Sequence, residues 1–210
     1  MDRNKKKLNQ YAKPTSSEGK EVVEMMNASH FHLTNWGLEK VQIAGTDTIL
    51  DIGCGGGRTV ATLAGQVFMG KVYGLDHSPD CVKWAAEYNR HLVDSGRVEI
   101  VQGSVEQMPF KDESFHLVVA VETIYFWTAL RQSFKEVYRI LKPDGCFLVV
   151  NEMYLGEESF KERNEKCMAT EEMTIYSPAQ VEKLMKEAGF RNISTDMLIE
   201  KNWLRCLARK

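Results

Sequence analysis

Residues 48–57, TILDIGCGGG, decide the fold class of this 210-residue chain. TILDI is a short apolar run that contains one aspartate, Asp51, a composition typical of a buried parallel strand. The glycines that follow lack a Cβ atom, so a ligand can approach the backbone and φ values that other residues avoid become accessible. A stretch with helical spacing comes next. The segment therefore predicts a strand, a ligand-binding turn and a helix.

The alternation of apolar, strand-like runs with helical stretches continues along the chain after this segment. Four further apolar runs follow, each separated from the next by a helical or polar stretch. They are KVYGLD (71–76), VEIVQG (98–103), FHLVVAVE (115–122) and CFLVVNE (146–152). Strands that alternate with helices predict an α/β fold with a parallel sheet covered on both faces, whose ligands bind beyond the carboxyl ends of the strands. The final residues, 190–210, can add a hairpin that turns at 200–202.

Four sites along the chain carry signals for helix ends. Ser78 precedes Pro79 and predicts a helix start, and Ser177 with Gln180 predicts a capping box. Gly189 predicts the end of the helix that begins there. Residues 142–145, KPDG, predict a turn after the preceding helix.

Composition limits the class of protein. The formal net charge is −2 and the isoelectric point is about 6.2, so the basic excess of a dedicated nucleic-acid binder is missing. The five cysteines show no paired spacing, which predicts a reduced, cytoplasmic protein without a metal site. The sequence also shows no signal peptide and no apolar run long enough for a membrane span. We expect a polar tail over 1–20 and a single domain over 21–210, as a monomer or homodimer.

The glycine spacing separates two kinds of nucleotide site. A dinucleotide fingerprint, G-x-G-x-x-G, requires its third glycine at position 58, where Arg58 stands. With Asp51 two residues before the first glycine, the loop suits a cofactor that carries an amino-acid tail. Asp76 closes the next strand and can accept hydrogen bonds from two ribose hydroxyls. Alternatively, Asp76 is a turn or helix-capping residue before Ser78.

Four motifs in order resemble one family. ILDIGCGGG, YGLDHS, GSVEQMPFKDESFHLVVAVE and LKPDGCFLVV are similar to successive motifs of the class I methyltransferases that use S-adenosylmethionine, especially the small-molecule branch of ubiquinone and menaquinone biosynthesis. The match runs from residue 48 to residue 151. The resemblance implies a Rossmann-like sheet of seven strands, mostly parallel with helices on both faces and the last strand antiparallel. S-adenosylmethionine would lie across the first four strand ends and leave as S-adenosylhomocysteine.

The resemblance also implies a set of cofactor-binding residues. Asp51 and the glycine turn would hold the methionine portion, Asp76 the ribose and His77 the adenine face. The full set is Asp51, Gly53, Cys54, Gly55, Gly57, Asp76, His77, Gly103, Ser104, Val105 and Val121. Two positions depart from the family pattern. Ser104 stands where relatives commonly have an aspartate, and His116 replaces an aspartate whose role is mainly structural.

The acceptor site is predicted from position in the fold. Methyl transfer depends mostly on alignment, and a base is needed only if the nucleophile arrives protonated. Glu122 and Glu152 follow two neighbouring strands, where side chains face the ligand, although both also suit structural roles. Catalytic candidates are Glu122, Tyr125 and His32, and substrate-binding candidates are His30, Trp36, Trp127 and Glu152. Two carboxylates favour a cationic or proton-donating acceptor.

We therefore expect methyl transfer to a small-molecule acceptor, with residues 21–45 as an N-terminal lid and residues 153–176 as an insert over the site. A non-catalytic module that binds S-adenosylmethionine remains an alternative. A Rossmann oxidoreductase is disfavoured by Arg58. Polyamine synthesis is disfavoured because Val121-Glu122-Thr123 lacks the acidic pair expected after the fourth strand.

Overall fold

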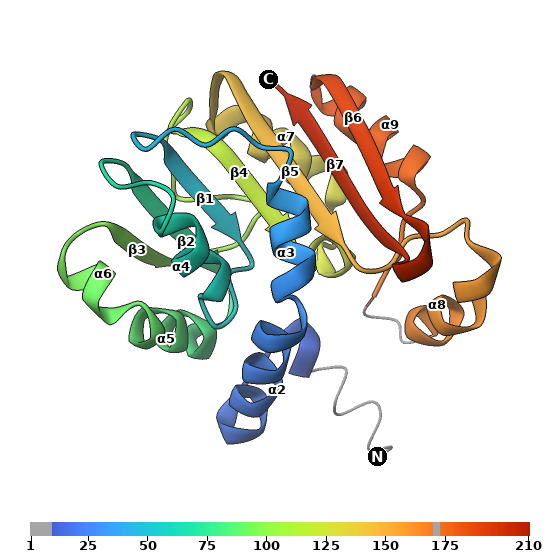
Figure 1. The fold of residues 1–210 in the computed structure, drawn as a ribbon, viewed down its shortest axis with the longest axis horizontal. Coiled ribbons are helices and arrows are strands. Elements are labelled where there is room, and N and C mark those ends of the chain that lie inside the picture. The colour runs from blue at the N-terminus through green and yellow to red at the C-terminus, as the bar shows by residue number, and fades with distance from the viewer. Residues whose placement is uncertain (1–9, 170–172) are drawn as a thin grey trace.

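The computed structural model describes residues 10–169 and 173–210. Within these residues seven strands form one sheet in the order β3-β2-β1-β4-β5-β7-β6 (Figure 1). The strands are β1 Thr48–Ile52, β2 Lys71–Asp76, β3 Val98–Gln102, β4 Phe115–Val121, β5 Leu141–Asn151, β6 Arg191–Leu198 and β7 Trp203–Arg209. Strands β1 to β5 pair in parallel, whereas β7 is antiparallel to both of its neighbours. The predicted fold, with its antiparallel last strand, is confirmed.

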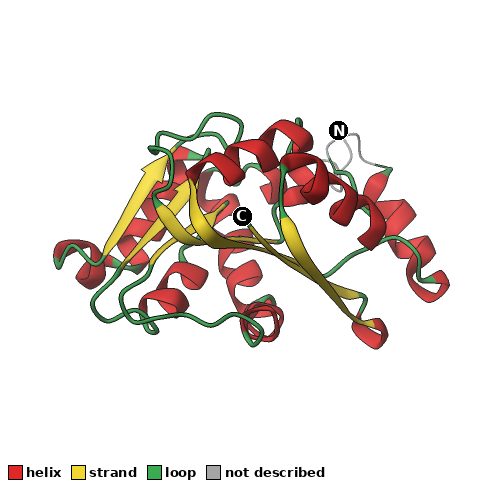
Figure 2. Cartoon of the chain, turned by 90° about the horizontal axis from the view of Figure 1, so that it is seen from above, coloured by secondary structure: helices red, strands yellow, loops and turns green. Residues whose placement is uncertain are grey.

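Helices cover both faces of the sheet (Figure 2). They are α2 Ser16–Ser29, α3 Phe31–Leu38, α4 Arg58–Ala64, α5 Pro79–Tyr88, α6 Arg90–Asp94, α7 Leu130–Ile140, α8 Lys161–Met168 and α9 Pro178–Ala188. Neighbouring strand residues point to opposite faces, so Leu50 packs toward α7 and α9 while Ile49 packs toward α3, α4 and α5. Two apolar cores result, one on each side of a sheet whose central strands are buried.

The predicted helix ends are confirmed. The hydroxyl oxygen of Ser78 accepts a hydrogen bond from the backbone N–H of Cys81, and Pro79 is the first residue of α5. Ser177 and Gln180 form a reciprocal capping box at the start of α9. Gly189 ends α9 in the left-handed conformation, with φ of 105°. The C-terminal hairpin is also present, with its turn at 199–202.

The turn predicted at 142–145 takes a different form. Helix α7 ends at Ile140 and strand β5 begins directly at Leu141. Phe115 pairs with Leu141 and Leu117 pairs with Cys146, so residues 142–145 form a bulge within the β4–β5 pairing. Asp144 adopts φ of 62° in this bulge. The sequence predicted correctly that residues 142–145 interrupt the regular backbone. Their inclusion in strand β5 depends on pairing with β4.

The predicted polar tail is shorter than residues 1–20. Helix α2 begins at Ser16, whose backbone N–H donates to the Asp80 carboxylate at 3.1 Å. The carbonyl of Pro14, a buried residue, accepts from the Ser78 hydroxyl at 2.9 Å. Both contacts join segments far apart in the sequence, so the local polarity of residues 10–20 gave no sign of them. Residues 1–9 lie outside the described part of the chain.

The carboxyl ends of strands β1 to β5 meet at one edge of the sheet. Helices α2 and α8 lie beyond this edge, below the arrowheads in Figure 1. The structure thus brings the N-terminal segment and the segment after β5 to the place where ligands bind in such sheets. No helix in residues 10–169 and 173–210 has the length and apolar character required to cross a bilayer.

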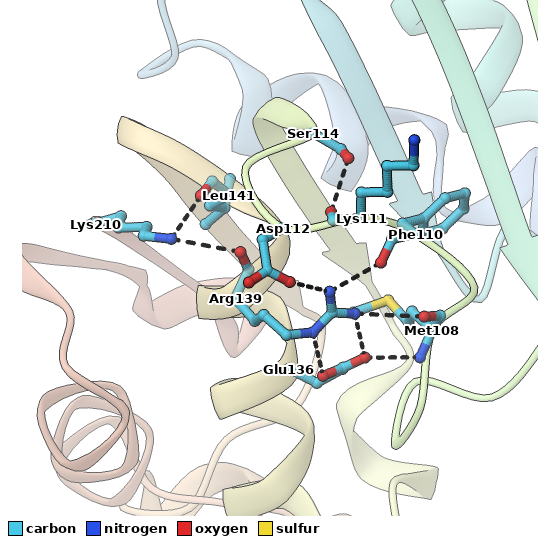
Figure 3. Close-up of polar contacts among 9 residues, drawn as sticks. All are labelled: Met108, Phe110, Lys111, Asp112, Ser114, Glu136, Arg139, Leu141 and Lys210. Carbon is cyan, nitrogen blue, oxygen red and sulfur yellow. Dashed lines mark hydrogen bonds and ion pairs between the residues drawn. The ribbon is translucent and has the colours of Figure 1, made fainter.

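A network centred on Arg139 fixes the segment between β3 and β4 (Figure 3). The Arg139 guanidinium donates to Glu136, to Asp112 and to the carbonyls of Phe110 and Met108. Glu136 in turn accepts from the backbone N–H of Met108 at 2.9 Å. These bonds attach the segment to α7. Since the segment begins directly after β3, the network also determines where its first residues lie.

We expect Arg139→Gln to lower the free energy of unfolding by about 1 to 3 kcal/mol, because it leaves the largely buried Glu136 carboxylate without its charged partner. Arg139 holds the pKa of Glu136 below its usual value, so this stabilisation is present at neutral pH and is lost as the pH falls and Glu136 protonates. Urea unfolding at neutral pH and near pH 4 measures both effects.

Arg131→Gln is the matched control, since its ion pair with Glu187 on the surface involves a 60% exposed arginine. The Arg131→Gln substitution should lower the free energy of unfolding by less than about 1 kcal/mol. Equal losses in the two variants would show that the Arg139 network contributes no more than a surface ion pair.

Candidate active site

A cavity of about 850 Å³ opens at the carboxyl ends of the strands. Its wall includes residues from the turns after β1 to β5, from α2 and from the segment around α8. The predicted cofactor residues that line it are Asp51, Gly53, Cys54, Gly55, Asp76, His77, Gly103, Ser104, Val105 and Val121. Most of the cofactor site predicted from sequence is therefore brought together around one space.

The three glycines of the turn that were predicted to bind the ligand have different structural roles. Gly55, at φ of 51°, faces open space, since a Cβ added there would meet no atom within 4 Å. At Gly53 an added Cβ would lie 2.4 Å from the Thr123 side chain. Gly57 precedes α4 and packs against Ala85 and Asn89, and it does not line the cavity. Its predicted contact with the ligand is wrong, because its close approach is to helix α5.

Asp51 presents an unpartnered carboxyl oxygen at the cavity wall. Its side chain is buried, and its Oδ2 atom has no hydrogen-bond partner among residues 10–169 and 173–210. Burial, assisted by the negative charge of Asp76, raises the pKa of Asp51 to about 8. A buried polar atom without a partner is unfavourable by itself. A ligand with a cationic amino group would supply the missing donor.

Asp76 serves both of the roles considered for it. Its Oδ2 accepts from the Gly55 backbone N–H and its Oδ1 from that of Ser78, each at 2.9 Å. Burial raises its pKa, and these two bonds oppose the shift. Each carboxylate oxygen keeps a further lone pair, so ribose hydroxyls can still be accepted. Ser104 also lines the cavity, and its hydroxyl accepts from the Glu106 N–H at 3.2 Å.

Three titratable side chains meet at the other end of the cavity: His30, Glu122 and Glu152. One ligand atom from each lies within 4.8 Å of the others. The His30 Nε2 and Glu122 Oε2 atoms are 3.9 Å apart, and the backbone N–H of Glu152 donates a short hydrogen bond to Glu122 Oε1. Burial, with the charge of Glu152, raises the pKa of Glu122 well above its usual range. Burial also lowers the pKa of His30, against the effect of Glu152.

Glu122 is held in a conformation that is rare for its residue type. Its φ is 60°, in the left-handed region, which costs a residue with a side chain on the order of 1 kcal/mol. Its backbone N–H donates to the Val150 carbonyl at 2.9 Å, so the strand pairing of β4 with β5 continues into this residue. The surrounding contacts therefore fix the direction of the carboxylate.

Tyr125 positions its neighbours. Its buried hydroxyl accepts from the backbone N–H of Met153 at 2.9 Å and lies 3.2 Å from both Glu122 Oε1 and the Met153 carbonyl. Burial and the charge of Glu122 raise the pKa of Tyr125 well above its usual range. The phenol thus stays protonated at neutral pH and is unsuited to act as a base. Tyr125 instead connects Glu122 to the start of the segment after β5.

Two predicted acceptor residues lie elsewhere. His32 is exposed on α3, with its ring edge-on to Phe31, and does not line the cavity. Trp36 packs against Trp203 at 5.9 Å and beneath the Arg205 guanidinium, within the core between α3 and the sheet. The helical geometry turns both side chains away from His30. Trp127, in contrast, lines the cavity as predicted.

Part of the cavity wall was not predicted from the sequence. Arg163 and Cys167 reach the cavity from α8, and the methionines on the wall give it an apolar surface. These methionines are Met25, Met26, Met153 and Met173. Arg58 donates to the carbonyl of Asn27 at 3.0 Å and stacks on Phe31, so it joins α4 to α2. None of these residues carries a distinctive motif, and only the arrangement of α2 and α8 reveals them.

His116 has a structural role. Its Nδ1 accepts from the Thr48 backbone N–H at 2.9 Å, and its Nε2 lies 3.1 Å from the Lys142 ammonium. It supports the start of β1, at the opposite end of that strand from the cavity. Its departure from the family pattern thus leaves the ligand site unchanged.

Comparison with known proteins agrees with this geometry. Residues 50–149 match the family model described as a methyltransferase domain. These residues, just under half of the chain, are similar to a methyltransferase domain of the S-adenosylmethionine-dependent class. S-adenosylmethionine is the cofactor of this class. The matched residues span the sheet from β1 to β5 and supply most of the cofactor end of the cavity.

Two curated relatives are named for different acceptors. Sterol 4-C-methyltransferase strm-1 of Caenorhabditis elegans is 30% identical over 136 residues, which cover 65% of this chain and 39% of the relative. Demethylmenaquinone methyltransferase of Chlorobaculum tepidum is 35% identical over 105 residues, covering 50% and 40%. The alignments thus span about two fifths of each relative's length and leave the acceptor open.

Solved structures share the fold of the methyltransferase domain and its flanking segments. A chain from the complex of the Haloferax volcanii Trm112 methyltransferase activator with a methyltransferase superposes with a TM-score of 0.82, at 21% identity over 96% of both chains. Human N-acetylserotonin methyltransferase in complex with S-adenosylmethionine gives a TM-score of 0.75 at 17% identity, over 93% of this chain and 56% of that one. At these identities the likeness establishes the fold.

We expect Asp51→Asn to stabilise the ligand-free protein increasingly as the pH rises from about 4 to about 8. The folded chain keeps the Asp51 proton up to about pH 8, whereas the unfolded chain releases it near 3.8, so ionisation opposes folding between these values. The variant cannot ionise and escapes this loss. Thermal unfolding across the pH range measures the effect.

The same variant should bind S-adenosylhomocysteine at least about tenfold more weakly, because a neutral amide replaces the charged partner of the amino group. Calorimetric titration measures this change. A variant that is less stable than the wild type at about pH 8.5 and binds normally would show that Asp51 is a structural residue.

Proposed function

We propose that the protein transfers a methyl group from S-adenosylmethionine to a small-molecule acceptor bound in the same cavity. One observation carries the proposal: a single space joins the Asp51, Gly55 and Asp76 wall to the cluster of His30, Glu122 and Glu152. The methyltransferase family match supports the reaction class. Relatives named for sterols and demethylmenaquinone support a small-molecule acceptor.

The residues at the cofactor end fit the expected ligand. The unpartnered carboxyl oxygen of Asp51 would receive the amino group, and the open face of Gly55 leaves space beside the backbone. Asp76 retains lone pairs for the ribose, and His77 and Ser104 line the cavity where the adenine would lie. When bound, S-adenosylmethionine supplies a methyl group already activated on a sulfonium. The protein's task is then to orient the acceptor and to receive its proton.

Glu122 is the proposed proton acceptor. The pKa of the Glu122 carboxyl is raised from its usual acidic value in the direction of neutral pH. A general base works best when its pKa lies near the working pH. The rigid placement of Glu122 fixes the direction of Oε2. This oxygen would take the acceptor proton as the acceptor lone pair bonds to the methyl carbon, the methyl–sulfur bond breaks and S-adenosylhomocysteine leaves. His30 and Glu152 would bind the same polar group of the acceptor. The nearby methionines and aromatic rings suit an apolar body, so we infer an amine, phenol or thiol on an apolar frame.

The two segments outside the matched residues form the proposed cover of the acceptor. The N-terminal segment, 21–45, contributes Met26 and His30 to the wall, and the insert, 153–176, contributes Arg163 and Cys167. Closing an active site in this way excludes water and strengthens the polar contacts inside it.

A product screen tests the proposed function. The protein is incubated with S-adenosylmethionine and a library of amines, phenols, thiols and carboxylic acids, and products that gain one methyl group are sought by mass spectrometry. Gly55→Val is the control, because a branched side chain at φ of 51° would strain the turn and enter the cavity. We expect a product with the wild type and none with the variant.

Other outcomes would contradict the proposal. Binding of S-adenosylhomocysteine without any methylated product would favour a non-catalytic binding module. A change in reduced nicotinamide absorbance would favour an oxidoreductase, despite Arg58. Equal product with Gly55→Val would place the reaction outside this cavity.

We expect Glu122→Gln to reduce turnover of the identified acceptor by about a hundredfold or more, while the affinity for S-adenosylhomocysteine changes little. Glutamine keeps an oxygen that can accept from Glu152 and Tyr125 but cannot take a proton. Glu158→Gln is the control, since that side chain is 87% exposed. Full turnover by Glu122→Gln would assign Glu122 a structural role.

A further inference from the structure

We propose that His30, Glu122 and Glu152 bind one divalent metal ion at the acceptor end of the cavity. The proposal deepens the proposed function, since the ion would share its space with the acceptor. It also departs from the sequence-based expectation of no metal site. That expectation came from the cysteine spacing, whereas these three residues are far apart in the sequence and only the fold brings them together.

The geometry suits ligands of a common ion. The three side chains come from separate elements: the junction of α2 with α3, the end of β4 and the end of β5. His30 Nε2 and Glu122 Oε2 are 3.9 Å apart, too far for a hydrogen bond. Two ligands at about 2.1 Å from one ion lie about 3 to 4 Å from each other. The whole set, within 4.8 Å, needs only small side-chain movements to enclose an ion.

Glu122 is oriented as metal ligands commonly are. Its Oε1 atom accepts from the Glu152 backbone N–H and lies 3.2 Å from the Tyr125 hydroxyl, and these contacts leave Oε2 toward His30. Outer contacts of this kind hold metal-binding carboxylates in place. Within the described residues, neither the His30 ring nor the Glu152 carboxylate makes a hydrogen bond, so both can coordinate an ion without losing one.

The charge of the site favours a cation. Two carboxylates face each other beside a largely apolar wall, where the Glu122 side chain is 10% exposed and that of His30 is 20% exposed. Arg163 lines the same cavity, but its guanidinium donates to the Glu152 carbonyl at 3.1 Å. A divalent ion would compensate the negative charge of both carboxylates at once.

The ligand types select the class of metal. One imidazole nitrogen with two carboxylate oxygens suits Mn²⁺, Fe²⁺, Co²⁺ or Zn²⁺, whereas Mg²⁺ and Ca²⁺ prefer oxygen ligands alone. Three protein ligands leave coordination positions open, as catalytic sites require. An oxygen, nitrogen or sulfur of the acceptor could occupy such a position. The ion would then orient the acceptor, and Glu122 would serve as a ligand of the ion in place of the proton-accepting role proposed for the metal-free site.

Titration of chelator-treated protein with CoCl₂ tests the site. We expect one Co²⁺ per chain, visible absorption from the bound ion, displacement by ZnCl₂ and no displacement by equal MgCl₂. His30→Gln and Glu152→Gln should each weaken Co²⁺ binding at least about tenfold. His32→Gln and Glu158→Gln are matched controls, one residue of each type outside the cavity, and should bind as the wild type does. Circular dichroism of the chelated proteins confirms that each variant is folded.

Two results would overturn the metal proposal. The first is a wild type that shows no Co²⁺ absorption, and the second is a control that loses as much affinity as the cavity variants. Should His30→Gln fail to fold, Glu152→Gln and the wild-type spectrum decide the question. Methyl transfer to the acceptor from the screen, measured with and without chelator, separates the two hypotheses. Equal turnover with and without chelator would contradict the metal proposal and support the proposed methyl transfer. Co²⁺ binding without any methylated product would support the metal site and contradict the proposed methyl transfer.

Discussion

The turn after β1 is attached to the end of β2, and the ligand site depends on this attachment. The backbone N–H groups of Gly53 and Cys54 both donate to the Leu75 carbonyl, and that of Gly55 donates to the Asp76 carboxylate. These bonds require a chain that bends back sharply, with φ of 72° at Gly53 and 51° at Gly55. They bring Asp76 close enough to Asp51 for its charge to help raise the pKa of Asp51. The cofactor end of the cavity follows from one tight glycine turn.

Function and stability oppose each other at this edge of the sheet. Asp51 has a buried oxygen without a partner, and Glu122 combines a left-handed backbone with a buried carboxyl. Both features are unfavourable in the ligand-free chain, and the pairing of the central strands offsets them. The Arg139 network shows the opposite design. There both oxygens of Glu136 accept hydrogen bonds, and the segment after β3 is held by residues that do not line the cavity.

Much of this arrangement could be predicted from sequence, and the limit has a physical basis. The strands, the capping box at Ser177 and the places of Asp51 and Asp76 on the cavity wall follow from local pattern and spacing. The predictions that differ from the structure concern the direction in which side chains point. Trp36 and His32 lie on a short helix whose orientation is set by packing against β5, where Gly37 contacts Val150. The contribution of Arg163 likewise depends on where α8 lies, and no periodicity in a polar segment contains that information.

The two ends of the cavity have different origins in the chain. The cofactor end is built from residues 51–121, inside the part that matches the methyltransferase family. At the acceptor end, Glu122 comes from the matched part, whereas His30 and Glu152 lie outside it. A sheet edge that fixes the cofactor can thus be combined with different flanking segments, each bringing its own polar groups to the methyl position. Relatives named for acceptors as different as a sterol and demethylmenaquinone agree with this division. The acceptor preference of this chain should therefore reside in α2, α3 and the segment after β5.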